Sequence, residues 1–117
     1  MNPKRLRVVG ALDLAVGTSA TFEFEHGGEA LEGFVLRHDA GLFAYVNRCP
    51  HWAVDLDLGD GRFYAADLDL IYCKNHGALF RVTDGVCVSG PCLGRALEPL
   101  SIEVDGADVW VSMDPTP

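Results

Sequence analysis

The stretch TFEFEHGGEALEGFVLRHDAGLFAYV, residues 21–46, decides the fold class. Apolar and polar residues alternate over 21–25 and 29–36, and a largely apolar run follows over 42–46. A period of two predicts half-buried strands. The intervening segments, 26–29 and 38–41, hold Gly, His and Asp, residue types that tolerate tight turns. The stretch therefore predicts antiparallel strands joined by short turns.

The same pattern returns towards the C-terminus, where 101–104 and 108–112 alternate on either side of the turn-like segment 105–107. No long apolar stripe at helical spacing occurs anywhere in the chain, and only short helical turns are expected, over 12–16 or 53–58. We therefore predict an all-β fold class, an antiparallel sandwich or barrel.

Length and composition predict one globular domain over residues 1–117. A second hydrophobic core would need more residues than the chain has, and the contents of 49% hydrophobic and 22% charged residues are those of a globular protein. No signal peptide is visible, and no stretch approaches the roughly 18 apolar residues that a spanning helix needs. We expect a cytoplasmic protein with no membrane role.

The net charge of −8 argues against nucleic acid as a partner, because phosphates would be repelled by most of the surface. The same acidity would speed encounters with a basic docking face, which suits transient redox partners. Acidity also serves solubility alone, so charge does not identify a partner.

Two short segments in the middle of the chain carry the chemistry: CPH at 49–51 and CKNH at 73–76. Each follows an apolar stretch, 42–46 and 68–72, so the candidate ligands lie on turns at strand ends and can converge. Paired Cys and His suit a 2Fe-2S centre in which one iron takes two thiolates and the other two neutral imidazoles. A structural zinc site is the alternative, although zinc modules usually bring Cys-x2-4-Cys or His-x3-5-His pairs.

These motifs resemble the Rieske iron-sulfur family, in its ferredoxin-type branch. The resemblance extends through GALF at 77–80 and SGP at 89–91, and covers most of residues 40–112. It implies cluster-binding loops at about 47–56 and 72–80, with a proline loop at about 88–92 covering the cluster from a third side. The ligands that it implies for the single 2Fe-2S cluster are Cys49 and Cys73 on the inner iron and His51 and His76 on the outer iron.

Some residues depart from the family pattern without removing a ligand. Lys74 replaces a frequent Pro, Ala53 stands where Gly is commoner, and 21 residues separate His51 from Cys73, a few more than is usual. We interpret the extra length as a hairpin extension between the loops. Ala78 cannot donate the hydroxyl hydrogen bond found in high-potential members, so a low potential is expected.

The resemblance implies a Rieske-type ferredoxin that carries one electron, from a reductase to a terminal oxygenase, and has no catalytic site of its own. A second possibility within the family is a small subunit of a larger, nitrite-reductase-like oxidoreductase. A third, from another class, is a zinc-stabilised binding module, which would be colourless where a Rieske protein is red-brown.

Two cysteines and two histidines lie outside the motifs. Cys87 and Cys92 could form a disulfide only if the loop between them bends back to bring the Cα atoms within about 7 Å; otherwise they are buried thiols. His26 and His38 lack a neighbouring cysteine and are expected at the surface.

Overall fold

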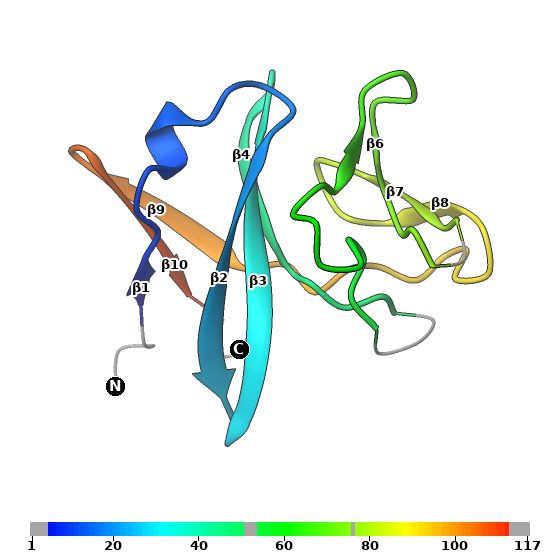
Figure 1. The fold of residues 1–117 in the computed structure, drawn as a ribbon, viewed down its shortest axis with the longest axis horizontal. Coiled ribbons are helices and arrows are strands. Elements are labelled where there is room, and N and C mark those ends of the chain that lie inside the picture. The colour runs from blue at the N-terminus through cyan, green and yellow to red at the C-terminus, as the bar shows by residue number, and fades with distance from the viewer. Residues whose placement is uncertain (1–4, 51–53, 76, 113–117) are drawn as a thin grey trace.

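The computed structural model describes residues 5–50, 54–75 and 77–112, and these form three small antiparallel sheets (Figure 1). The strand orders are β1-β10-β9, β2-β3-β4 and β5-β6-β7-β8. No α-helix occurs in the described ranges, which confirms the predicted all-β class. The elements are β1 (Leu6–Arg7), the 3-10 helix η1 (Ala11–Asp13), β2 (Ser19–His26), β3 (Glu29–His38), β4 (Gly41–Val46), β5 (Tyr64–Ala65), β6 (Leu70–Tyr72), β7 (Leu79–Arg81), β8 (Cys87–Ser89), β9 (Ser101–Asp105) and β10 (Asp108–Ser112).

The central sheet, β2-β3-β4, comes from the stretch with alternating residues, and each predicted strand is present. The strand β3 differs from the prediction in one respect: residues 33–36 are buried on both faces, not half-buried. Phe34 and Leu36 face one core and Val35 faces the other, because successive side chains of a strand point to opposite sides. The strand β3 thus lies between two cores and contributes side chains to both.

The sheet β1-β10-β9 covers one face of the central sheet (Figure 1). Val109 and Val111 of β10 belong to the same core as Val35 and Ala44. Backbone bonds join the chain before β9 to β4: Val46 N–H donates to Glu98 O and Leu100 N–H to Ala44 O, each at 2.9 Å. The predicted pair of C-terminal strands is therefore confirmed, and its place over β4 is set by these bonds.

The sheet β5-β6-β7-β8 and its loops lie on the other side of the central sheet (Figure 1). Phe63 stacks on Phe34 with ring centroids 3.9 Å apart, and the Tyr45 hydroxyl donates to Val82 O at 2.5 Å. At the far end of β3, His38 Nε2 lies 2.8 Å from Asp69 Oδ1. The side chain of His38 is 13% exposed, so it lies only partly at the surface, where it was expected.

Two smaller predictions have different outcomes. A short helical turn is present near the N-terminus as η1, at Ala11–Asp13, close to the predicted 12–16. The other candidate fails in its described part, because residues 54–58 form bends and a turn. Among the described residues, no helix is long and apolar enough to cross a membrane.

Candidate metal centre

Two loops of the structure are closed in the same way, each by a bond from a cysteine. Cys49 N–H donates to Val54 O at 2.9 Å, and Cys73 N–H donates to Ala78 O at 2.8 Å, so each bond spans five positions. Each cysteine follows a strand, β4 and β6 respectively. Their exposed fractions are 2% and 0%, so both are shielded from water. The structure therefore presents two equivalent loops, each beginning at a buried cysteine.

The two loops lie against one another. Lys74 N–H, directly after Cys73, donates to Leu56 O in the first loop at 2.9 Å. Cys49, Cys73, Leu56 and Ala78 belong to one core. Two of the four predicted ligands are thus brought together in a dry setting. The other two, His51 and His76, lie outside the described residues. In the sequence, His51 falls between the two residues that close the first loop, and His76 between the two that close the second.

A third segment, the predicted proline loop, lies on the second of these loops. Gly90 has φ +105°, and a Cβ atom placed there would lie 2.8 Å from Ala78 Cα. The chain just beyond this segment is joined to the first loop, because Arg95 Nη1 donates to Pro50 O at 3.2 Å. Three chain segments distant in sequence therefore meet around the two cysteines.

A buried polar network holds the first loop at its start. The Asn47 side chain donates to Glu32 Oε1 at 2.6 Å and to Asp57 Oδ1 at 3.0 Å, while its own oxygen accepts from Leu56 N–H at 2.8 Å. Gly61 N–H donates to Asp57 Oδ2 at 2.9 Å. Sequence reasoning missed this network. Its one signal was a polar residue between an apolar strand and Cys49.

The predicted hairpin between the loops is present, but β5 and β6 form it, as an antiparallel pair. The extra residues 59–62 lie before its first strand: residues 57–61 form turns and bends, and Leu58, Gly59 and Gly61 have positive φ. The segment folds back on itself because the Asp57 carboxylate accepts from Gly61 N–H, and Asp60 forms an ion pair with Lys74. The extra length thus supports the second loop from the side.

Asp57 makes the stability of this region depend on pH. Burial raises the pKa of its carboxyl, but hydrogen bonds from Asn47 and from the backbone of Gly59 and Gly61 outweigh burial and lower it below the ordinary value. A carboxylate with a lowered pKa in the folded state stabilises the fold above its unfolded pKa, about 3.9. That contribution is lost as pH falls through the folded pKa.

We expect Asp57→Asn to lower the free energy of unfolding by about 1–2 kcal/mol at neutral pH and by less in acid. Urea unfolding between about pH 7 and pH 3 would measure this, with Asp55→Asn, at an exposed neighbour, as the matched control. Parallel pH profiles for the parent and the Asp57 variant would contradict the assignment.

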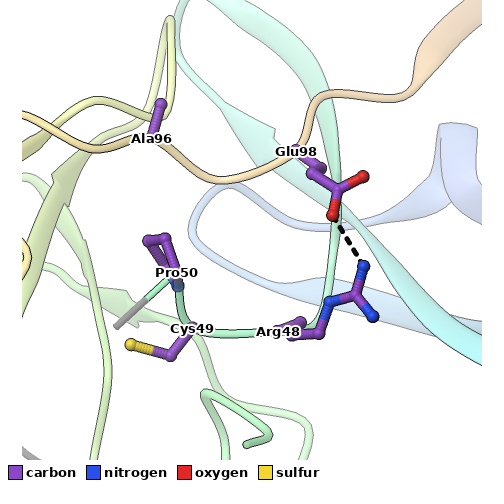
Figure 2. A pocket seen from close by; sticks show the side chains of 5 residues that line it. All are labelled: Arg48, Cys49, Pro50, Ala96 and Glu98. Carbon is purple, nitrogen blue, oxygen red and sulfur yellow. Dashed lines mark hydrogen bonds and ion pairs between the residues drawn. The ribbon is translucent and has the colours of Figure 1, made fainter. Parts of the chain in front are cut away.

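A hollow of about 310 Å³ lies outside the first loop (Figure 2). It is lined by Arg48, Cys49, Pro50, Ala96 and Glu98. Arg48 Nη2 donates to Glu98 Oε1 at 2.7 Å, and this bond raises the pKa of Arg48 further, so the pair is ionic. Figure 2 shows the Cys49 sulfur pointing away from that pair. Cys49 therefore lines the hollow, while its thiol is directed away from the ion pair.

All four cysteines of the chain lie in one core. Burial, together with the nearby Cys87 and Cys49, raises the pKa of the Cys92 thiol to about 12. Cys92 is therefore a protonated thiol at neutral pH. It also begins no closed loop of the kind that Cys49 and Cys73 begin, which sets it apart from these two as a metal ligand.

Comparisons with known proteins agree with this geometry. The family model described as "Rieske [2Fe-2S] domain" matches residues 5–111. A comparison with curated protein sequences gives no match.

Solved structures give close matches in fold. The chain is similar to the ferredoxin of carbazole 1,9a-dioxygenase from Nocardioides aromaticivorans IC177, with 26% identity, a TM-score of 0.71, and coverage of 94% of this chain and 98% of that one. It is also similar to a chain in the complex of reduced oxygenase and oxidized ferredoxin in carbazole 1,9a-dioxygenase, at 28% identity and a TM-score of 0.72, with 99% of both chains covered. The matching 30% of a longer chain in the reduced complex between oxygenase and ferredoxin in carbazole 1,9a-dioxygenase has the same fold, at 23% identity and a TM-score of 0.73, and covers 97% of this chain.

Proposed function

Because the chain belongs to the Rieske [2Fe-2S] domain family, we propose that Cys49 and Cys73 bind one iron of its single cluster and that His51 and His76 bind the other. The pair of closed loops supports this proposal, since each loop begins at a buried cysteine within three residues of the end of a strand. The two histidines are assigned from the sequence, because each lies between the two residues whose backbone bond closes a loop.

The described residues suit such a cluster chemically. Two ferric irons, two sulfides and two thiolates sum to zero charge, so a cluster with two neutral imidazoles can lie in an apolar core at lower cost than an all-thiolate cluster. When bound, the cluster accepts and releases one electron. The loops exclude water around the two thiols, and Ala78, which is fully buried, offers no hydroxyl to a sulfide. The low potential expected from the sequence remains part of the proposal.

The chain is a ferredoxin-type electron carrier that takes one electron from a reductase and passes it to a terminal oxygenase. This rests on similarity over nearly the whole chain to a ferredoxin of carbazole 1,9a-dioxygenase, and to a chain in a complex of such a ferredoxin with its oxygenase. The net charge of −8 would steer basic faces of partners towards it. The proposal includes one domain over residues 1–117, no catalytic site within it, and a cytoplasmic location, where buried thiols such as Cys87 stay reduced.

Spectroscopy of the purified protein tests the proposal. We expect a red-brown protein with equal iron and acid-labile sulfide, and a Rieske-type electron paramagnetic resonance signal after dithionite reduction. A colourless protein that binds zinc and takes up no iron on anaerobic reconstitution would overturn it. Purification as a stable complex with a larger enzyme would overturn the role of a free carrier and favour that of a subunit.

A further inference from the structure

Cys87 and Cys92 form a pair of thiols that the metal centre does not use. Their sulfur atoms are 3.0 Å apart, and both are free. A disulfide bond is about 2.05 Å long, so a movement of about 1 Å separates the pair from bonding. The exposed fractions are 2% for Cys87 and 1% for Cys92. The loop between them therefore bends back as a disulfide would require.

The backbone sets this approach. Cys87 N–H donates to Arg95 O at 2.7 Å, and Gly94 N–H donates back to Cys87 O at 3.2 Å. Arg95 N–H also donates to Cys92 O at 2.8 Å. The chain thus leaves β8, reverses, and returns against Cys87, which brings Cys92 beside it. These bonds fix both ends of the loop and hold the two cysteines side by side.

The loop between the two thiols, residues 88–91, is the one that lies on the second ligand loop. Gly90 contacts Ala78 so closely that no Cβ atom fits between them. The Ala78 carbonyl in turn accepts the bond from Cys73 N–H that closes the second loop. A bond between Cys87 and Cys92 would therefore hold the two ends of the proline loop together. Gly90 in this loop packs on the loop that begins at Cys73, a predicted iron ligand.

We propose that Cys87 and Cys92 are a dithiol–disulfide pair, which on oxidation locks the proline loop against the cluster-binding loop. The oxidant is a small-molecule disulfide. One cysteine thiolate attacks it and expels a thiolate, giving a mixed disulfide; the second cysteine thiolate then displaces the other half. Two cysteine thiols are oxidised, one disulfide is reduced to two thiols, and the two cysteine protons pass to the released thiolates.

Burial determines when this exchange takes place. Both sulfurs are almost out of contact with solvent, so a small disulfide reaches them only when the proline loop opens. The pair therefore stays as two thiols in a reducing compartment and closes slowly under sustained oxidising conditions. Once closed, it restricts further opening of the loop.

Thiol mapping in the complete protein tests the pair directly. Cluster-loaded protein is incubated in glutathione buffers from fully reduced to fully oxidised, then denatured in acid, alkylated and digested with trypsin. Cleavage after Arg81 and Arg95 leaves both cysteines in one peptide, 82–95. We expect this peptide to carry two alkyl groups after incubation in the reduced buffer. After incubation in the oxidised buffer it should carry none, and its mass should be two hydrogens below that of the unmodified dithiol peptide. Two alkylated cysteines in every buffer would overturn the proposal.

The effect on the cluster is measured by its release to a chelator, followed by the loss of visible absorbance. Release from the oxidised protein is expected to be about tenfold slower than from the dithiol form, because the short closed loop opens less often. The double variant C87S/C92S is the matched control and should release its cluster at a rate independent of the glutathione buffer. Equal rates for both forms of the parent would overturn the locking role.

The pair and the proposed function fail separately. Iron and sulfide content reports on the metal centre, and the mass of peptide 82–95 reports on the pair even in protein that carries no cluster.

Discussion

Cys49→Ser and Cys73→Ser proteins are expected to be isolated without a cluster, with iron content at background. Each substitution removes a thiolate from a loop whose remaining order depends on the bond that the same residue donates, to Val54 O or Ala78 O. Metal binding contributes directly to folding when its site is not preformed in the unfolded chain. The free energy of unfolding should therefore fall by about 3 kcal/mol or more, measured by denaturant unfolding together with iron and sulfide analysis.

Cys87→Ser is the matched control for this experiment. Cys87 is as buried as Cys49 and lies in the same core, so a serine there also places a hydroxyl in an apolar setting. It is expected to keep full iron content and to lose only about 1–2 kcal/mol of stability. Full iron content in Cys49→Ser or Cys73→Ser would refute the ligand assignment.

Gly90→Ala is expected to displace the proline loop and to speed cluster loss. A Cβ atom at Gly90 would meet Ala78 Cα at 2.8 Å, and φ is +105°. The backbone conformation costs an L-residue about 1–2 kcal/mol, and overpacking against the buried Ala78 adds about 1–3 kcal/mol. We therefore expect a total loss of about 3 kcal/mol in the free energy of unfolding, with faster release of iron to a chelator.

Gly94→Ala separates the two contributions. Gly94 lies two positions beyond the proline loop and has φ +87°, but a Cβ atom there would have no neighbour within 4 Å. This variant should lose only the conformational part, about 1–2 kcal/mol, and should keep the parent's rate of iron release. If both variants lose stability and iron equally, the contact between Gly90 and Ala78 does not hold the proline loop in place.

Much of the fold could be predicted because its signals are local. Alternation over 21–36 places apolar side chains on one side of an extended chain, and Gly27 and Gly28 permit the reversal between the strands. The two motifs were likewise readable, because Cys49 and Cys73 each follow a strand and begin a short turn. Neighbours along the chain determine such features, so the sequence alone contains them.

Other features depended on which segments the tertiary structure brings together. Residues 33–36 are buried on both faces because a further sheet packs on each side of β3. Alternation of apolar and polar residues does not indicate how many faces of a strand are covered. The place of Asn47 depended on Glu32 and Asp57, to which its amide donates.

The sequence by itself thus determined the all-β class, the pair of Cys and His motifs and the family they resemble. Only the tertiary structure decided that Gly90 lies on Ala78 and that the sulfurs of Cys87 and Cys92 are 3.0 Å apart. Two residues five positions apart can lie in contact or well separated, depending on the path of the chain between them. That path is set here by backbone bonds within residues 87–95 and by the close packing of Gly90 on Ala78, which the pattern of apolar and polar residues does not encode.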